Sequence, residues 1–334
     1  MSVNTKFKGM AAKLGVMGRY RLEAFTGVEL ADGTVVETAG SRRVAADWFD
    51  NVITNLGFNN MHTQLHLNYA QVGTGSATPA YTDTQLDTWL AGTSTTQNQV
   101  NAIQTSSPYY TSCTVTKRFG IGVAAGNLTE VGIGWAASGT TLFSRALILD
   151  NGGSPTTITI LSNEYLDIVY EYRVYPPEGA DYTGTVVIDS ITYDVTGRAC
   201  NIDTLRGSPN STSAGWIPYL DNFTAINTVY GHSFGFAYSG VIGTITDVPA
   251  GSSDSIGDPT FVTYVTDSFQ HVYDFVMDYG EANALGGVRS MRLNTGWSCW
   301  QFEFSAQGSG DPIPKDNTMQ ITFTLKLDFT RATI

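Results

Sequence analysis

Residues 115–177 read VTKRFGIGVAAGNLTEVGIGWAASGTTLFSRALILDNGGSPTTITILSNEYLDIVYEYRVYPP. They belong to a longer segment, Leu67–Pro177, in which short runs typical of β-strands alternate with tight turns. Sequences that favour turns with positive φ recur about one strand apart, at Ala125–Asn127, Ser138–Gly139 and Asn151–Gly153. This spacing is typical of an antiparallel sandwich or barrel and argues against a helix-rich enzyme.

Regular alternation of apolar and polar residues predicts three individual strands. Glu164–Tyr175 is the strongest in the first half, and Pro176 and Pro177 end it because proline cannot donate a ladder hydrogen bond. Phe269–Tyr279 and Thr318–Phe329 show the same period of two in the second half. We therefore expect a mainly β fold of two antiparallel β-sandwich-like domains, with a few short helices in the first domain.

Two helices and one hairpin are also predicted in the first half. The apolar residues of Ala45–Met61 have helical spacing, and Tyr81–Leu90 reads as a second short helix with Thr82 as its N-cap. Ala31–Gly33 is a hairpin signal between two strand-like runs. Helices of this length are not stable alone in water, so both must pack on the sheet.

The chain of 334 residues is long enough for two compact domains. We place the boundary in PPEGADYTG, residues Pro176–Gly184, where the two prolines stop a strand. The expected organisation is an extended basic N-terminal arm at residues 1–18, a β-rich anchoring domain with short helices at 19–178, and a β-sandwich-like domain at 179–334. The arm is inferred because the first 18 residues lack a regular period.

Charge is distributed unevenly along the chain. The net charge of −12 argues against general nucleic-acid binding, which needs a basic surface. Residues 1–43, in contrast, contain seven basic and four acidic side chains. This excess indicates either a solvated, flexible start or a basic segment that docks on an acidic partner. The candidate anchoring residues are Lys6, Lys8, Lys13, Arg19 and Arg21.

The lack of a recognisable secretion signal, together with the number and spacing of the cysteines, favours a protein that folds in a cytoplasm. The first 18 residues are of mixed character and lack the apolar core of a secretion signal. No segment approaches the ~20 apolar residues that a membrane-spanning helix needs. Cys113, Cys200 and Cys299 are odd in number and far apart, so we expect reduced, mostly buried thiols.

Patterns for catalysis or metal binding are weak. His62 and His66 have i, i+4 spacing, but the helix should already have ended and no third ligand lies nearby, while His271 is expected in the core. The aspartates of the loop Asp247–Pro259 indicate solvated groups rather than a glycosidase pair, and an ion site there stays open. Gly120–Gly126 leads into a hairpin, so it is no phosphate loop. We predict no catalytic residue, no cofactor and no metal site.

A group of aromatic residues in the second half lies among Gly, Ser and Asn without clean alternation. Core packing explains any one of them, but aromatic rings beside small polar residues are also typical of carbohydrate recognition and of subunit interfaces. The predicted recognition surface consists of Trp216, Tyr219, Phe223, Tyr230, Phe236 and Tyr238.

Five segments carry a resemblance to a known family through their order and spacing. They are NVITNLGFNNM (Asn51–Met61), QVGTGSATPAYTDTQL (Gln71–Leu86), TEVGIGWAASGTTLFSRALI (Thr129–Ile148), LDIVYEYRVYPP (Leu166–Pro177) and IPKDNTMQITFTLKLDFTRA (Ile313–Ala332). In these segments the chain resembles bacteriophage tail proteins that serve as tail-fibre or baseplate-associated structural components.

The resemblance implies a non-enzymatic virion protein of the tail fibre, tail tip or baseplate, made and folded in the cytoplasm of the bacterial host. It would anchor through its N-terminal part and contribute to host attachment. The implied partners are other tail proteins, further copies of the chain (a trimer, as in most fibres) and a glycan or protein receptor on the host. No nucleic acid and no membrane span are expected.

Three alternatives stay open. A capsid-decorating, collar or head-fibre protein would share this composition and fold. A carbohydrate-binding module of a secreted type fits less well, because an export signal and paired cysteines are missing from the sequence. A polysaccharide depolymerase fits least, because the chain has neither a β-helix repeat nor a convincing carboxylate pair.

Overall fold

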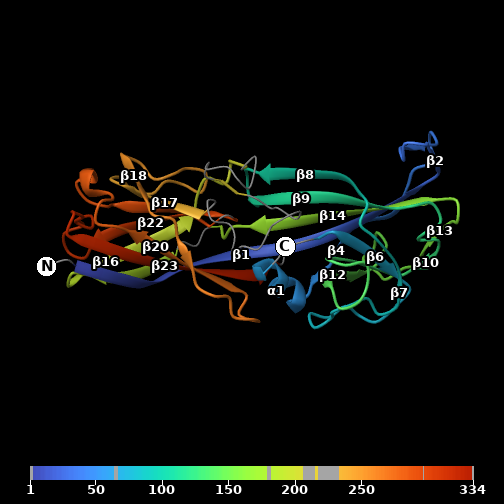
Figure 1. Cartoon of the computed structure of the whole chain (residues 1–334), viewed down its shortest axis with the longest axis horizontal. Coiled ribbons are helices and arrows are strands. Elements are labelled where there is room, and N and C mark those ends of the chain that lie inside the picture. Colours follow the sequence, from blue (N-terminus) through green and yellow to red (C-terminus); the bar gives the residue numbers. More distant parts are fainter. Residues whose placement is uncertain are drawn as a thin grey trace.

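The structure is a computed structural model that describes residues 3–63, 67–178, 182–205, 215–216, 233–295 and 297–332. The molecule is elongated, and long strands run along its long axis (Figure 1). The predicted mainly β fold is confirmed. Within the described ranges, the helices are α1 (Asn55–Thr63) and the short 3₁₀ helix η2 (Asn283–Leu285).

An eight-stranded sheet connects the two ends of the molecule. Seven strands follow one another across it, and an eighth, β4, pairs with β1 off this path. In order, the strands are β19 (Thr260–Phe261), β20 (Gln270–Met277), β23 (Met319–Arg331), β1 (Val3–Phe25), β14 (Tyr165–Tyr175), β9 (Tyr110–Phe119) and β8 (Thr96–Gln104), with β4 at Arg43–Asp50. The three strands predicted from alternation are therefore confirmed as β14, β20 and β23.

Strand β1 lies at the centre of this sheet and runs along most of the molecule (Figure 1). Its first part pairs in parallel with β23, from Val3 opposite Met319 onward. Its second part pairs in antiparallel fashion with β14, as far as Phe25 opposite Tyr165, and also with β4. The parallel pair departs from the expected purely antiparallel arrangement.

The predicted N-terminal arm is wrong for the described residues, because residues 3–18 belong to β1. Met10 and Leu14 are fully buried, as is expected of a central strand. The period of two was hard to recognise for two reasons. Small residues such as Ala12 occupy core positions, and a bulge between Lys8 and Met10 shifts the phase of the alternation.

A five-stranded sheet packs on one end of the long sheet. Its order is β5 (Val52–Ile53), β12 (Leu142–Leu147), β11 (Glu130–Gly134), β6 (Tyr69–Gly73) and β7 (Trp89–Thr93). The Phe143 ring meets the Tyr172 ring edge-on with 5.9 Å between centroids, and the Tyr20 hydroxyl is 2.6 Å from Ser144 Oγ. A two-stranded sheet of β10 (Gly126–Leu128) and β13 (Ile158–Ile160) lies at the same end (Figure 1).

A six-stranded sheet packs on the other end. Its order is β15 (Tyr182–Ile188), β16 (Ile191–Ala199), β22 (Cys299–Ala306), β21 (Ser290–Thr295), β17 (Ser233–Tyr238) and β18 (Ser253–Ile256). Phe304 and Phe323 join it to the long sheet, with 5.4 Å between ring centroids. The predicted boundary at Pro176–Gly184 thus separates the two smaller sheets, but the long sheet takes strands from both sides of it and the buried residues form one core.

Both predicted helices need correction. The first half of Ala45–Met61 forms β4 and β5, and only its end lies in α1. Tyr81–Leu90 is a loop that leads into β7, because the backbone N–H groups of Asp87 and Thr88 donate to the buried Glu130 carboxylate instead of to helical carbonyls. In both segments tertiary contacts override a helical pattern.

Candidate assembly interface

A small hairpin stands off one end of the molecule. Strands β2 (Gly27–Glu29) and β3 (Val35–Glu37) pair only with each other, and Figure 1 shows them projecting beyond the long sheet. The turn signal at Ala31–Gly33 is therefore confirmed. Within the described ranges, no further strand extends this two-stranded sheet.

The tip of the hairpin is a well-ordered turn. Leu30 N–H donates to Thr34 O at 2.8 Å, and Gly33 N–H donates to Leu30 O at 2.9 Å. Gly33 has φ of 83°, which only glycine adopts readily. The Asp32 carboxylate accepts the Thr34 N–H at 2.9 Å, and this hydrogen bond lowers the pKa of Asp32. The exposed Asp32 side chain is therefore ionised at neutral pH.

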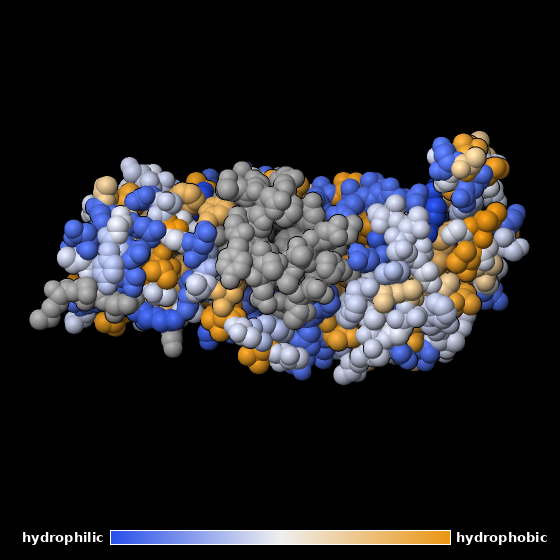
Figure 2. Space-filling model, in the orientation of Figure 1, coloured by the Kyte–Doolittle hydropathy of each residue, from blue (hydrophilic) through white to orange (hydrophobic). Residues whose placement is uncertain are grey.

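The hairpin presents apolar and acidic side chains to solvent. Val28, Leu30 and Val36 are 65%, 47% and 52% exposed. In Figure 2 the hairpin is a knob on which hydrophobic and hydrophilic residues alternate. The segment 27–37 has three acidic residues and no basic residue. An isolated two-stranded hairpin is marginally stable in water, and this one leaves three apolar side chains exposed to solvent.

Arg42 fixes the base of the hairpin to the long sheet. Its guanidinium donates to Glu37 at 2.7 Å, to Glu23 at 2.8 Å and to Asp167 at 3.0 Å. Partial burial lowers the pKa of Arg42, but the hydrogen bonds that it donates to these three carboxylates outweigh this effect and raise the pKa overall. Arg42 also lies over the Phe25 ring at 4.2 Å. The hairpin is therefore held in position rather than tethered loosely.

A buried ion pair organises the long loop beside α1. Glu130 is fully buried and accepts the backbone N–H groups of Gly75, Asp87 and Thr88 at 2.7–3.0 Å. Arg145 donates to Glu130 at 2.9 Å and to Asp83 at 2.6 Å. A Cβ on Gly75 would lie 2.5 Å from Glu130 Oε1, so this close approach requires glycine. These contacts join the resembling segments 71–86 and 129–148 into one unit.

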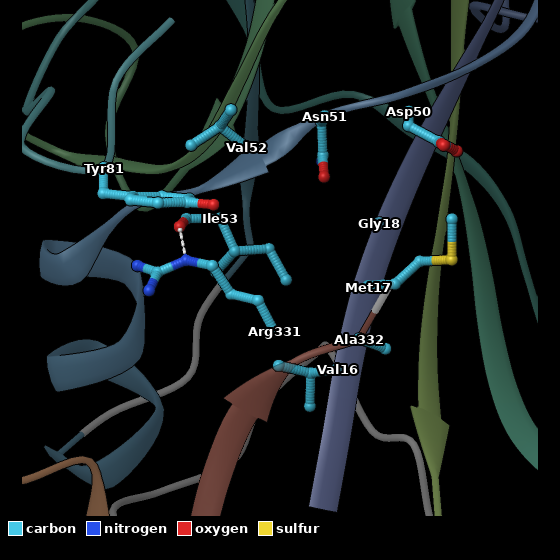
Figure 3. Close-up of a pocket in the computed structure, with 10 residues that line it drawn as sticks. All are labelled: Val16, Met17, Gly18, Asp50, Asn51, Val52, Ile53, Tyr81, Arg331 and Ala332. Atoms are coloured by element: carbon cyan, nitrogen blue, oxygen red, sulfur yellow. Dashed lines mark hydrogen bonds between the residues drawn. The ribbon is translucent and has the colours of Figure 1, made fainter. Parts of the chain in front are cut away.

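A cavity of about 260 Å³ lies between this loop, β1, β5 and the end of β23 (Figure 3). Arg331 forms one wall, where its Nε donates to Ile53 O and its Nη2 donates to Asn55 Oδ1, both at 2.8 Å. Its guanidinium is 3.9 Å from the centroid of the Tyr81 ring. Burial lowers the pKa of Arg331, and among the described residues no carboxylate lies within 4.0 Å of it.

Asn51 forms the opposite wall of the cavity. Its Nδ2 donates to the Tyr170 hydroxyl at 3.3 Å, while its buried Oδ1 accepts no hydrogen bond from the part of the chain that is described. Gly18 makes this arrangement possible, because a Cβ there would lie 2.2 Å from the Tyr170 hydroxyl. Among the described residues, the cavity therefore combines a cation without a carboxylate partner and an acceptor without a donor.

The predicted anchoring residues lie on the long sheet and contact acidic groups of the same chain. Lys6 pairs with Asp274, Arg19 with Glu171, and Arg21 with Glu23 and Asp47. Lys13 is exposed, and the side chain of Lys8 lies outside the described residues. Most of the positive charge of residues 1–43 is thus neutralised internally.

The predicted recognition surface is not exposed where it is described. Trp216 is fully buried, donates Nε1–H to Cys200 O at 2.8 Å and contacts Trp300. Tyr238 is 6% exposed, and the half-buried Phe236 lies under Arg292. Trp216 and Tyr238 are therefore buried, and Phe236 is half-buried, so none of the three is a freely exposed ring. Tyr219, Phe223 and Tyr230 lie outside the described residues.

Of the residues considered above for metal binding or catalysis, His271, Asp247 and Asp254 are held by contacts within the described chain. His271 is buried against Tyr264, Tyr273 and Phe329, and burial lowers its pKa to about 3. His62 lies in α1, but its side chain and the whole of His66 are outside the described part. Asp247 accepts hydrogen bonds from the backbone and hydroxyl of Thr244, and Asp254 accepts Ala282 N–H.

Three further observations concern the cysteines, possible metal sites and membrane-spanning helices of the described chain. The three cysteines are buried and form no disulfide, as predicted. No cluster of three or more His, Cys, Asp or Glu side chains within the described ranges has the geometry to hold a metal ion. No described helix is long and apolar enough to cross a bilayer.

Comparisons with known proteins give no relative for this chain. No protein-family model matches it, and no match is found among curated proteins or among solved structures. A function for this chain can therefore be proposed only from the geometry above and from the resemblance of the five sequence segments to tail proteins.

The sequence contained only part of the signal for these sites. The turn at Ala31–Gly33 was recognisable, but nothing in the pattern indicated that β2 and β3 would pair with no other strand. The Arg331 cavity combines residues 16–18, 50–53, 81 and 331–332, and no local spacing could have joined them.

Proposed function

We propose that the chain is a non-enzymatic structural subunit of a bacteriophage tail, located in the fibre, the tip or the baseplate, and that it assembles with further copies of itself. The observation that carries this proposal is the β2–β3 hairpin. It exposes Val28, Leu30 and Val36 at one end of the molecule, and Arg42 holds it in a fixed position.

A rigid, exposed apolar hairpin is suited to assembly rather than to catalysis. Because the hairpin is fixed before it binds, little conformational entropy is lost when a neighbour covers it. The acidic chain repels its own copies at long range, so association needs a specific contact of this kind. The anchoring role expected of residues 1–43 is thus moved from a basic arm to the hairpin at residues 27–37.

The organisation of the resembling segments supports the same proposal. Residues 129–148 contain the Glu130–Arg145 ion pair, which residues 71–86 contact through Gly75 and Asp83. Residues 166–177 and 313–332 supply β14 and β23 on either side of β1. Segments that are similar to tail proteins therefore build the frame that carries the hairpin. Since Trp216 and Tyr238 are buried, the proposal assigns this chain to assembly and not to receptor binding.

Incorporation into phage particles tests the proposal. Residues Val28–Val36 are replaced by Asn-Gly, which shortens the hairpin and leaves the Arg42–Glu37 contact in place. We expect a folded chain that is lost from purified tails, measured by quantitative mass spectrometry and by antibody labelling in the electron microscope. Val265→Ser, which removes a 68% exposed apolar side chain elsewhere, is the control and should incorporate normally. Labelling on the head, or none on the particle, would contradict a tail location.

A further inference from the structure

Arg331 is a half-buried cation that needs an anion. Among the described residues, its guanidinium donates two hydrogen bonds, and both go to neutral oxygens, Ile53 O and Asn55 Oδ1. Two other enclosed guanidiniums of the chain have carboxylate partners: Arg118 donates to Asp167 at 2.7 Å, and Arg145 donates to Glu130. Enclosing a guanidinium without a counterion is costly, so the Arg331 cavity is suited to an anionic group.

The rest of the cavity restricts what that anionic ligand can be. Asn51 Oδ1 is a buried acceptor on the opposite wall, so the ligand should also bring an N–H donor. A volume of about 260 Å³ admits a turn of a peptide or a few small side chains. Asp50 is the acid that lines the cavity, and Figure 3 shows it on the far side from Arg331. The anionic group must therefore bind at the Arg331 and Tyr81 wall.

The tip of the hairpin has the complementary groups. Asp32 is exposed and ionised, and within the described chain its carboxylate contacts groups of its own turn, chiefly the Thr34 N–H at Oδ1. The backbone N–H of Ala31 donates to no acceptor in the described structure, so it is available to a partner. Leu30 adds an exposed apolar side chain beside it. One short turn thus presents a carboxylate, an N–H donor and a hydrophobic group together.

We propose that the hairpin tip of one copy inserts into the Arg331 cavity of a second copy. The Asp32 carboxylate accepts hydrogen bonds from the Arg331 guanidinium, and a tip N–H donates to Asn51 Oδ1. This inference rests on the proposed function, because it names the partner that the assembly hairpin binds.

The placement of the two surfaces makes this a contact between copies. The hairpin projects at one end of the molecule, whereas the cavity lies near α1 and the end of β23 in its middle (Figure 1). The two surfaces differ, so the contact is heterologous: it closes into a ring when the rotation permits, and otherwise propagates as a filament. A closed ring of three would agree with the trimer that the resemblance implies.

Substitution of the tip charge is the first test. Asp32→Asn keeps Oδ1 as acceptor for Thr34 N–H and removes only the charge, so the hairpin should stay folded. We expect self-association of the purified full-length chain, followed by sedimentation velocity over a concentration series, to weaken roughly 30-fold or more, as for a desolvated charge pair. Glu29→Gln removes an exposed acid from the same hairpin outside the turn and should change association less than about threefold.

A photo-crosslink then locates the acceptor. Leu30 is replaced by p-benzoylphenylalanine, and chains with natural and heavy nitrogen isotopes are mixed before irradiation. We expect crosslinked peptides that join unlike isotopes and contain residues 50–53, 81 or 331. A crosslink to another surface, or one confined to a single chain, would overturn the proposal.

Two further outcomes would also overturn it: wild-type association of Asp32→Asn, and a purified chain that stays monomeric at every concentration. These results leave the tail location itself standing, since that is decided by labelling of the particle. Conversely, association through this contact by a protein that is absent from tails would refute the proposed function alone. Arg331 need not be altered, so its bonds to Ile53 and Asn55 stay intact throughout.

Discussion

Glu130 shows how a single buried charge can determine the course of a loop. Its carboxylate accepts three backbone N–H groups and the Arg145 guanidinium, and so it holds residues 75–88 in a shape that is neither helix nor strand. Such a network is fully satisfied only as a whole, because removal of one charge leaves its buried partner uncompensated.

Glu130→Gln should therefore destabilise the chain strongly. The substitution leaves Arg145 with Asp83 as its remaining carboxylate and places an amide N–H₂ group among N–H donors. We expect a loss of about 3–5 kcal/mol in the free energy of unfolding, measured by urea denaturation. Asp258→Asn, at an exposed acid, is the matched control and should leave the urea midpoint nearly unchanged. Equal midpoints for the two variants would show that the ion pair does not hold the loop.

His271 makes stability depend on pH in a defined direction. Its pKa is about 3 in the folded chain because of burial, against about 6.5 when unfolded. Between these values the unfolded chain binds a proton that the folded chain does not, so stability falls as the pH drops from 6.5 toward 3, by at most about 1.4 kcal/mol per pH unit. His271→Phe should flatten this part of the profile. Parallel losses in both proteins between pH 6.5 and 4 would contradict this assignment.

The cysteines provide a separate check on the core. Cys200 Sγ and Cys299 Sγ are 3.2 Å apart and fully buried, and burial together with the Cys299 contact raises the pKa of Cys200. We expect all three thiols of the native chain to resist an aromatic disulfide reagent, and three equivalents to react after unfolding. Rapid reaction of the native chain would place at least one cysteine on the surface.

At the scale of elements, the long strand β1 matters most for the fold. It pairs with β23 in one half of the molecule and with β14 and β4 in the other, so it connects elements from both ends of the sequence. The hairpin β2–β3 has the opposite character, because it contributes little to the core and pairs with no other strand. One element is needed for folding and the other is available for assembly.

Two truncations should separate these roles. Removal of residues 1–18 deletes the part of β1 that pairs with β23 and exposes the core around Met10 and Leu14, so we expect no cooperative thermal unfolding transition. The chain with Val28–Val36 replaced by Asn-Gly should unfold within a few degrees of the wild type. Circular dichroism on heating measures both. A cooperative, wild-type transition of the chain without residues 1–18 would restore the idea of a dispensable arm.

These elements also show what the sequence could and could not predict. Strands with large apolar residues on alternate positions, such as β14 and β23, were predicted because periodicity is a local property. β1 was missed because a bulge and small core residues weaken the same signal, and the loop at 81–90 was read as a helix because Glu130 is 40 or more residues away. The Arg331 cavity depends on long-range pairing, which no window of sequence contains.

The whole molecule is an elongated β protein, with the exposed β2–β3 hairpin at one end and the Arg331 cavity in its middle (Figure 1). We propose that this acidic chain associates through few specific contacts and that the fixed hairpin supplies one of them. The proposed place of this chain in a phage tail rests on the resemblance of segments that form the frame around β1.

An electron cryomicroscopy map of the intact phage particle tests the central claim most directly. The account predicts several copies of this chain in the tail, with every β2–β3 hairpin buried against a neighbouring copy. Copies that occupy the head, or copies in the tail whose hairpins are exposed to solvent, would contradict it.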